Sequence, residues 1–371
     1  MLESEITIIN DQHIFSGTFT QTYRIFRNLK RHGIECEFYQ FLIDSSVSYL
    51  PEGLKLKKGY LSTLNWNHKS FYDLKLAINF LSGRNWKTFR KISADVVLLS
   101  YPSLLPLTRY FRKTIAEGHD LYFMYDGNEA GTLGAYTRRT YKHYKEAGHI
   151  VANSEFTKNE FIRLLDISPE KISVVYRAVG DIFCPGKCDI RSKLGIDESS
   201  VILLSVGGDN PNKNIETIVR LIKELPQNYI LIRVGRNFRT EKLIKKLGLG
   251  NRIIALGNVE EMFLSDLYRC SDIFLFPSTF EGFGIPVIEA MASGLPVISS
   301  NTTSLPEVVG NAGLLCDPYD LNCWKNKIET LVTDKHFYAK MRDKGIERSK
   351  YFSLDNQFVQ LMKVIESVSG R

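Results

Sequence analysis

Short apolar runs rich in β-branched residues alternate along the chain with longer stretches in which apolar positions recur at helical spacing. This alternation predicts parallel sheets flanked by helices, because a strand that is buried on both faces reads as a continuous apolar run. In the first half the predicted strands are Ile6–Ile9, Glu35–Phe41, Asp95–Ser100, Leu121–Tyr125, His149–Asn153 and Ile172–Tyr176. In the second half they are Val201–Val206, Ile230–Val234, Arg252–Leu256, Ile273–Phe276 and Val297–Ser299. The predicted amphipathic helices include Thr20–His32, Glu155–Asp166, Ile215–Glu224, Asn322–Thr333 and Leu354–Ser367.

A chain of 371 residues is too long for one ordinary core and predicts two domains. The periodic pattern is interrupted between Phe183 and Asp189, so we expect an N-terminal domain over 1–184 and a C-terminal domain over 190–350. The predicted fold class is α/β, with two Rossmann-like, doubly wound domains that face each other across a cleft. Ligands would bind at the C-terminal ends of the strands.

The segment after Ile273–Phe276 combines a glycine-rich loop, two carboxylates and the start of a helix. The loop reads Glu281-Gly282-Phe283-Gly284-Ile285, and we expect Glu289 in the first helical turn. Such a loop forms an anion site, because unpaired N–H groups and the helix dipole both favour negative charge. Carboxylates accept hydrogen bonds from hydroxyls, so phosphate and hydroxyls together indicate a nucleotide-sugar. Without a ligand, Glu281 would be a surface turn acid and Glu289 a residue that satisfies the helix dipole.

The spacing of Glu281 and Glu289 resembles the E-x7-E signature of glycosyltransferase family 4, the group 1 glycosyl transferases. Other segments also resemble this family: Ala152–Lys158, Val175–Val179, Val206–Asn214, Ser271–Ser278, Pro296–Ile298 and Leu305–Gly310. The resemblance implies a GT-B fold in which the last segment, 351–371, crosses back to the N-terminal domain. It also implies a retaining, metal-independent hexosyltransferase that takes a UDP- or GDP-linked sugar and needs no cofactor. The acceptor would be a saccharide or a lipid-linked glycan in cell-surface glycan synthesis.

The resemblance assigns roles to individual residues of the C-terminal domain. Glu289 would bind the ribose hydroxyls of the donor and Glu281 the transferred sugar, while Lys213 would meet the diphosphate. Backbone N–H groups of the loop would bind the sugar or the diphosphate, from Gly282, Phe283, Gly284 and Ile285. Many members have an arginine at the position of Gly208, so this chain lacks a cation there, and Arg236 is a candidate replacement.

The N-terminal domain carries weaker signals. Gly17, in Ser16-Gly17-Thr18, lies where the family's glycine loop approaches the donor phosphate or the acceptor. Many members end a later strand with a histidine near the reacting sugar. The predicted strand Leu121–Tyr125 is followed by Asp126 and no histidine, so Asp126 is the candidate polar residue there. His13 follows the first strand and is either a residue that faces the cleft or a structural one.

The net charge of +7 is unevenly distributed, because cations and aromatic residues are interleaved between Gly53 and Ala94. This segment is either a solvated face or a surface that docks on anionic lipid. Nucleic acid is disfavoured, because no nucleic-acid module is recognisable. The acidic segment Met1–Glu5 and the absence of a bilayer-length apolar run favour a cytoplasmic protein. If the basic aromatic segment docks on lipid, the protein would be peripheral on the inner membrane face. The scattered cysteines, of which only Cys184 and Cys188 are close in sequence, predict free thiols in a reducing compartment.

Several function classes lack their motifs. The sequence contains no D-x-D, HExxH, Walker A or G-x-G-x-x-G, which disfavours metal-dependent transferases, metalloproteases, P-loop enzymes and dinucleotide enzymes. Two alternatives to a transferase remain. One is a non-catalytic partner subunit that binds a nucleotide-sugar, and the other is a GT-B sugar-nucleotide epimerase.

Overall fold

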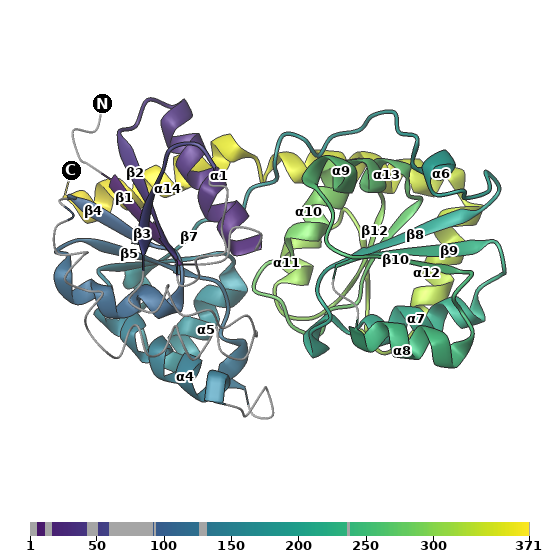
Figure 1. The fold of residues 1–371 in the computed structure, drawn as a ribbon, viewed down its shortest axis with the longest axis horizontal. Coiled ribbons are helices and arrows are strands. Elements are labelled where there is room, and N and C mark those ends of the chain that lie inside the picture. The colour runs from purple at the N-terminus through teal and green to yellow at the C-terminus, as the bar shows by residue number, and fades with distance from the viewer. Residues whose placement is uncertain are drawn as a thin grey trace. The chain divides into compact units, whose positions relative to one another are not determined.

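The computed structural model describes residues 6–11, 17–42, 51–58, 92, 94–125, 132–235 and 238–370. The chain divides into two compact units (Figure 1). Unit 1 comprises Met1–Arg177 together with Leu354–Arg371, and unit 2 comprises Ala178–Ser353. The division falls a few residues before the interruption at 183–189 on which the sequence-based boundary rested.

The described part of unit 1 is built on a parallel sheet of seven strands in the order β3-β2-β1-β4-β5-β6-β7. The strands are β1 (Ile6–Asn10), β2 (Cys36–Leu42), β3 (Leu54–Lys58), β4 (Val96–Leu99), β5 (Thr114–Gly118), β6 (His149–Ala152) and β7 (Ile172–Val174). The α-helices are α1 (Gly17–Arg31), α4 (Thr132–Tyr141), α5 (Glu155–Leu165) and α14 (Leu354–Ser369). The 3₁₀ segments are η1 (Pro102–Tyr110), η2 (Tyr122–Met124), η3 (Lys142–Glu146) and η4 (Pro169–Lys171).

Helices cover both faces of this sheet. On one face α1 and α14 pack together, and Phe26 of α1 and Leu361 of α14 share a buried cluster with Ile8 of β1. On the other face Tyr144 of η3 and Phe161 of α5 pack against the strands, with ring centroids 4.6 Å apart. The last helix of the chain therefore belongs to the core of the first unit.

The described part of unit 2 contains a parallel sheet of six strands in the order β10-β9-β8-β11-β12-β13. The strands are β8 (Val201–Val206), β9 (Tyr229–Val234), β10 (Ile253–Leu256), β11 (Ile273–Phe276), β12 (Val297–Ser300) and β13 (Leu314–Cys316). The helices are α6 (Ile190–Lys193), η5 (Pro211–Lys213), α7 (Ile215–Glu224), α8 (Phe238–Leu247), α9 (Glu261–Cys270), α10 (Ile285–Ala292), α11 (Leu305–Val309), α12 (Leu321–Thr333) and α13 (Lys335–Lys350). In Figure 1, α7, α8 and α12 lie on one side of the sheet, and α9 and α13 lie on the other.

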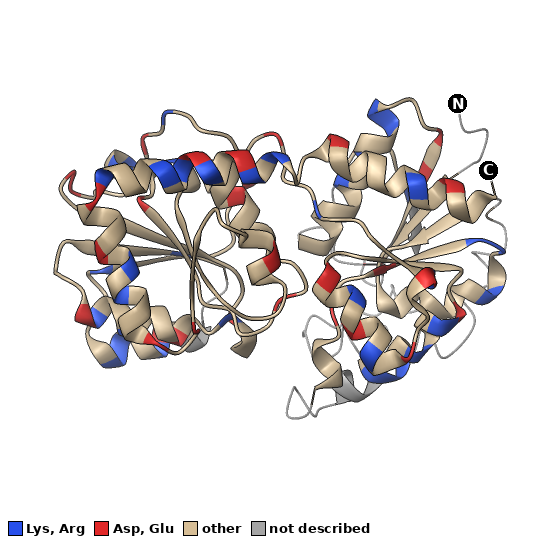
Figure 2. Cartoon of the chain, turned by 180° about the vertical axis from the view of Figure 1, so that it is seen from behind, with Lys and Arg blue, Asp and Glu red and all other residues tan. Residues whose placement is uncertain are grey.

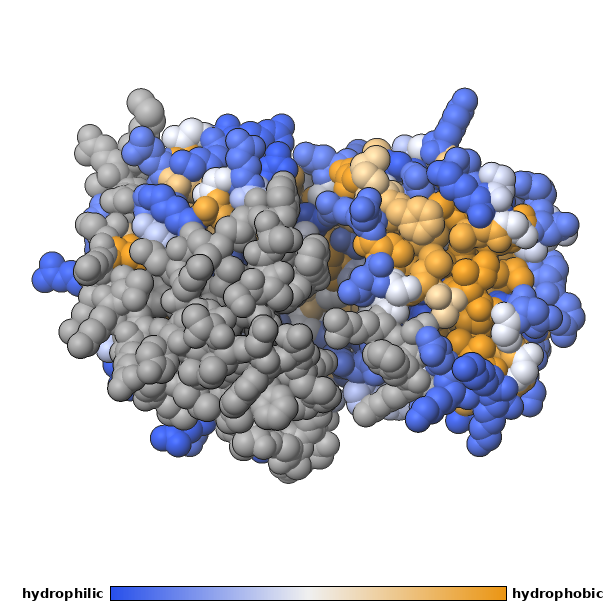
Figure 3. Space-filling view, in the orientation of Figure 1, coloured by the Kyte–Doolittle hydropathy of each residue, from blue (hydrophilic) through white to orange (hydrophobic). Residues whose placement is uncertain are grey.

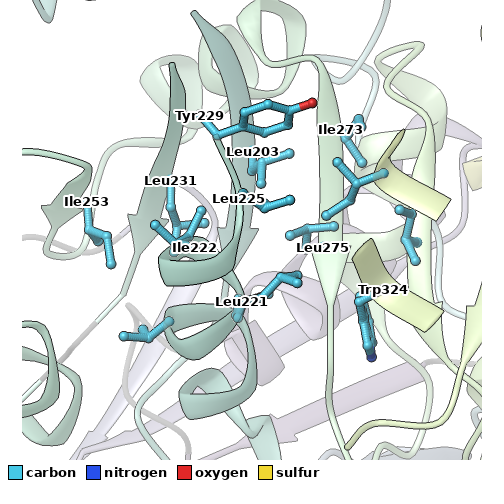
Figure 4. Close-up of a cluster of buried hydrophobic side chains, with 14 of the residues drawn as sticks. Leu203, Leu221, Ile222, Leu225, Tyr229, Leu231, Ile253, Ile273, Leu275 and Trp324 are labelled. Carbon is cyan, nitrogen blue, oxygen red and sulfur yellow. The ribbon is translucent and has the colours of Figure 1, made fainter. Parts of the chain in front are cut away.

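The core of unit 2 forms because α7 has one apolar face at helical spacing. Figure 4 shows Leu221 and Ile222 of this helix beside Leu203, Leu231 and Leu275 of the strands. Each of these five side chains is fully buried, and burying one leucine or isoleucine contributes roughly 1.5–3 kcal/mol. The cluster fixes the sheet, and with it the loops at the C-terminal ends of its strands.

The strand prediction is confirmed for most segments but wrong for Leu121–Tyr125. Tyr122–Met124 of that segment forms the 3₁₀ segment η2, and the strand lies earlier, at Thr114–Gly118. The sequence reading also missed β3 and β13. The free-thiol prediction is wrong for two cysteines, because Cys188 and Cys270 form a disulfide. It joins the segment before α6 to the end of α9, so these thiols no longer support a reducing compartment.

Charged side chains lie mainly along helices and loops (Figure 2). Apolar side chains gather on the face of unit 2 that Figure 3 shows, bordered by hydrophilic ones. Within the described residues, no helix combines the length and the apolar character that crossing a membrane requires.

Candidate active site

The candidate site lies where the strand order of unit 2 reverses. The chain runs from β8 outward to β9 and β10, then returns to β11, which pairs with β8. In parallel sheets, ligands bind beyond the C-terminal ends of the two strands at such a switch point. The turn 207–214 follows β8 and the loop 277–284 follows β11, so both predicted segments leave the sheet at this point.

Hydrogen bonds lock this turn and this loop together. The Asn212 Nδ2 donates to the carbonyl of Phe280 at 2.9 Å, and the amide of Thr279 donates to the Asn212 carbonyl at 2.7 Å. Asn214 donates to the carbonyl of Pro277 at 3.2 Å from a left-handed conformation, with φ of 48°. Asparagine tolerates this conformation better than most residues. The two segments are therefore held as one framework.

Lys213 and Glu281 meet across this framework, as the sequence predicts if both serve one site. The Lys213 Nζ lies 2.6 Å from the Glu281 Oε1 and 5.9 Å from the ring centroid of Phe276. The side chains keep 21% and 11% of their surface exposed, respectively. Lys213 and Glu281 are thus paired beyond the C-terminal ends of the two central strands, and both side chains remain partly exposed.

Two residues that the sequence reading did not assign brace the loop of Glu281. The Glu281 amide donates to the Thr303 Oγ1 at 3.0 Å, and the Ser304 hydroxyl lies 3.0 Å and 3.1 Å from the carbonyls of Glu281 and Phe283. Ser304 immediately precedes α11, a short helix that starts within the Leu305–Gly310 resemblance. That resemblance was the only signal, and it begins at Leu305, one residue after Ser304.

Gly284 ends the loop at the start of α10, and its conformation requires glycine. Its φ is +103°, and a Cβ built there would lie 2.7 Å from the Leu305 Cδ2. Gly282 and Phe283 are buried, and the ring of Phe283 packs edge-on to Phe352 at 5.4 Å. Ile285 is half-buried at the first position of α10, where helix geometry leaves the N–H without an intrahelical partner.

Glu289 lies one turn deeper in the helix than predicted. It is the fifth residue of α10, which begins at Ile285, so it occupies the second turn. Its side chain is buried at 7% exposure, and the Tyr268 hydroxyl donates to its Oε2 at 3.1 Å. Burial, and next the neighbouring Glu289 carboxylate, raise the pKa of Tyr268 well above its usual range, so the hydroxyl remains a donor. Tyr268 comes from α9, and no local motif marked it.

The structure describes only some of the other predicted site residues. Gly17 is the exposed first residue of α1, and Gly208 lies in the turn after β8. His13, Ser16, Asp126 and Arg236 lie outside the described residues, as does most of the basic aromatic segment between Gly53 and Ala94. Among the residues that the structure describes, no group of three or more His, Cys, Asp or Glu side chains is arranged to hold a metal ion.

A histidine does follow a strand in unit 1, contrary to the reading based on Leu121–Tyr125. His119 comes directly after β5, and its Nδ1 accepts a hydrogen bond from the Arg177 Nη2 at 2.8 Å. Arginine can only donate, so Nδ1 carries the lone pair and Nε2 carries the proton, which faces the Ser100 carbonyl at 2.5 Å. The Arg177 Nη1 lies 2.8 Å from the buried Glu117 carboxylate. Both ring nitrogens are therefore engaged within unit 1.

Comparison with protein families agrees with this geometry. Residues 187–348 match the family described as glycosyl transferases group 1, and residues 15–181 match glycosyltransferase family 4. The chain belongs to this glycosyltransferase family. The family matches span the segments on both sides of the unit boundary and include every residue of the candidate site in unit 2.

Curated relatives of this family member align over part of its length. The O-antigen chain mannosyltransferase B of Escherichia coli is 33% identical over 56% of this chain and 57% of its own length. A D-inositol 3-phosphate glycosyltransferase of Mycobacterium sp. (strain KMS) is 29% identical over 56% of this chain and 49% of its own. The chain thus spans about half the length of the curated relatives that it matches.

Solved structures of other glycosyltransferases share the whole fold. Sucrose-phosphate synthase from Thermosynechococcus elongatus superposes with a TM-score of 0.85, at 18% identity and 99% coverage of both chains. HepE of Anabaena, solved in complex with UDP and glucose, gives a TM-score of 0.77 at 17% identity, over 98% of this chain and 100% of its own. These likenesses confirm the predicted GT-B fold class.

Proposed function

We propose that this protein transfers a hexose from a nucleoside-diphosphate sugar to a saccharide or lipid-linked acceptor in cell-surface glycan synthesis. The observation that carries the proposal is the Lys213–Glu281 pair, held at 2.6 Å at the switch point of unit 2, with the buried Glu289 in the helix that follows the same loop. The donor would place its diphosphate at Lys213 and the start of α10, and its ribose hydroxyls at Glu289. The family membership supports the same reaction class.

The reaction would need no metal and would retain the configuration at the sugar carbon. The bond from this carbon to the phosphate oxygen breaks, and a bond to the acceptor oxygen forms on the same face. The departing phosphate oxygen takes the proton of the acceptor hydroxyl, so no side chain need act as the base. Lys213 offsets the negative charge that grows on the leaving diphosphate, which stabilises the transition state.

Glu281 would exchange partners when the donor binds. Without donor its carboxylate neutralises Lys213, and with donor the diphosphate takes over that role. The carboxylate is then available to accept a hydrogen bond from a hydroxyl of the transferred sugar. Because the loop is braced by Thr303 and Ser304, this exchange needs rotation of side chains and no movement of the backbone.

The transferred sugar is inferred from the relatives, and the contacts to the acceptor are inferred from predicted residues of unit 1. Several relatives are named mannosyltransferases, so mannose is the first sugar to test. Asp126 and Gly17 remain predicted contacts on the acceptor side. The basic aromatic segment between Gly53 and Ala94 remains a predicted docking surface for anionic lipid, tested by binding to anionic vesicles at low salt.

Calorimetric titration with UDP, GDP, ADP and dTDP tests the donor site. We expect one nucleotide to bind wild type, and Glu289→Ala to lower its affinity by about ten- to a hundredfold, because two charged hydrogen bonds to the ribose are lost. Glu216→Ala removes a carboxylate that is 65% exposed on α7 and should leave binding unchanged. Binding to none of the four nucleotides would contradict the proposal.

Turnover separates an enzyme from a partner subunit that only binds the donor. Wild type incubated with the matching nucleotide-sugar should release nucleoside diphosphate, by slow hydrolysis alone or faster with an added glycan acceptor. Tight binding without any release of diphosphate would favour the non-catalytic subunit.

A further inference from the structure

Arg233 is a fully buried cation in the middle of unit 2. It lies in β9, between Ile232 and Val234, and has 0% of its surface exposed. Taking a guanidinium out of water costs several kcal/mol unless it is compensated. Among the residues that the structure describes, no carboxylate lies within ion-pair distance of it, and its Nε has no hydrogen-bond partner. The Asp209 carboxylate favours its charged form from a distance, but burial is the larger effect and lowers the pKa of Arg233 to about 10, so the cost of this cation is only partly compensated.

The guanidinium binds carbonyls at the candidate phosphate turn. Its Nη2 donates to the carbonyl of Gly208 at 2.8 Å and also to that of Gly207, and its Nη1 donates to the carbonyl of Val234. Gly207 also packs closely on the turn after β9, since a Cβ on Gly235 would lie 2.0 Å from the Gly207 oxygen. Arg233 therefore fixes the turn that follows β8 from inside the unit.

This arrangement orients the turn toward a ligand. The peptide bonds are trans, so the N–H of each peptide points opposite to its carbonyl. Because the carbonyls of Gly207 and Gly208 point at Arg233, the amides of Gly208 and Asp209 point away from it. A Cβ placed on Gly208 would meet no atom within 4 Å, so the space beside Gly208 is open. Backbone amides arranged in this way bind anions.

We propose that Arg233 supplies the positive charge that many family members obtain from an arginine at the position of Gly208. It is a positioning residue, because it holds the turn and acts on the ligand through it. Its ligand class is the diphosphate of a nucleoside diphosphate, and the proposal rests on the function proposed above. A charge inside the unit acts through a medium of lower dielectric than water, so salt screens it less than a surface lysine.

Three variants test this proposal by calorimetry with UDP, UMP and uridine, or with GDP, GMP and guanosine, whichever base wild type binds. Arg233→Gln keeps donors but removes the charge, and should lower the diphosphate affinity by about tenfold while the nucleoside affinity stays unchanged. Arg233→Lys keeps the charge and should retain the diphosphate affinity to within about threefold. Gly208→Arg added to Arg233→Gln should restore most of the loss, because Gly208 has no positive φ and open space beside it.

The outcomes separate this proposal from a structural role and from failure of the proposed function. Equal losses of nucleoside and diphosphate affinity, or no rescue by Gly208→Arg, would overturn it. If Arg233→Gln does not fold, Arg233→Lys decides, since a tenfold loss of diphosphate affinity in a folded lysine variant contradicts a role for the charge. If wild type binds no nucleoside diphosphate, the proposed function fails before the variants are compared, and the role of Arg233 fails with it.

Discussion

Both units place charged residues at the C-terminal ends of their parallel strands and use them differently. In unit 2, Lys213 and Glu281 follow strands β8 and β11 and remain partly exposed. In unit 1, Glu117 and His119 lie at the end of β5 and meet Arg177 just beyond β7, where Glu117 and Arg177 are 1% and 7% exposed. Both groups lie at the C-terminal ends of parallel strands. The ion pair of unit 2 is more exposed than the Glu117–Arg177 pair, whereas the His119 side chain is 16% exposed.

The difference indicates which charges bind ligand and which hold the fold. In unit 1 the Arg177 guanidinium pairs with the Glu117 carboxylate and donates to the His119 imidazole, so these charges are compensated inside the unit, although both Glu117 oxygens lack a hydrogen-bond partner. In unit 2, Lys213 and Glu281 neutralise each other through a single contact. Both side chains can therefore form further hydrogen bonds with a ligand. Removing a cation should therefore impair folding in unit 1 and nucleotide binding in unit 2.

The largest effect is expected for Arg177→Met. This change leaves the buried Glu117 without its ion-pair partner, and should lower the free energy of unfolding by about 3–5 kcal/mol, measured by urea denaturation. Glu117→Gln added to Arg177→Met should recover part of the loss, because a neutral amide costs less to bury. Arg109→Met removes an ion pair that is 54% exposed on the arginine side, and should change the free energy of unfolding by less than about 1 kcal/mol. A similar loss in both arginine variants would refute the assignment of Glu117–Arg177 to folding.

A smaller effect on folding is expected for Lys213→Met, together with a clear effect on binding. The unfolding free energy should fall by about 1–2 kcal/mol, whereas the affinity for the nucleoside diphosphate should fall by about ten- to a hundredfold. Calorimetry and urea denaturation on the same preparation give both quantities. Lys223→Met, an exposed change on α7, is the matched control. If Lys213→Met destabilises the fold as much as Arg177→Met and leaves binding intact, the contrast between the units is wrong.

The smallest effect concerns pH. Burial, and next the charge of Arg177, lower the pKa of His119 from 6.5 to about 3. Between these values the unfolded chain binds a proton that the folded chain does not, so stability falls as pH decreases from about 6.5. Glu117 opposes this trend, because burial raises its pKa. The comparison with His119→Asn isolates the histidine: from pH 7 to pH 5.5 wild type should lose about 1 kcal/mol more than this variant.

His336 provides the control for the pH experiment, because it is exposed on α13. His336→Asn should follow the wild-type pH dependence. If His119→Asn also follows wild type, then His119 binds a proton in the folded protein and the neutral tautomer described above is wrong.

The parts of the molecule that the sequence predicts well are those with local signals. The loop of Glu281 and the helix after it follow from glycines, a proline and a strand within a short stretch, and α7 was predicted to the residue. Strand β5 was missed because Thr114–Gly118 contains a glutamate and a glycine in place of an apolar run. Strand β3 was missed because three of its five residues are lysines.

Residues that act through tertiary contacts could not be predicted. Tyr268 meets Glu289 only because α9 packs beside α10, and Cys188 meets Cys270 across 82 residues of sequence. The sequence analysis named Arg236 as the candidate replacement for the missing cation, and no local signal distinguished Arg233. Its role depends on the pairing of β8 with β9, which sets Ser205 opposite Arg233.

The position of α14 has a consequence for synthesis of the protein. Leu361, Met362, Val364 and Ile365 complete the core of unit 1, although the rest of that core is encoded before residue 178. On the ribosome, unit 2 is therefore fully emerged before unit 1 has received its last helix. Domains generally fold as units during translation, usually from the N-terminus. Here the unit that is made first is completed last, and until then the surface that α14 covers remains exposed.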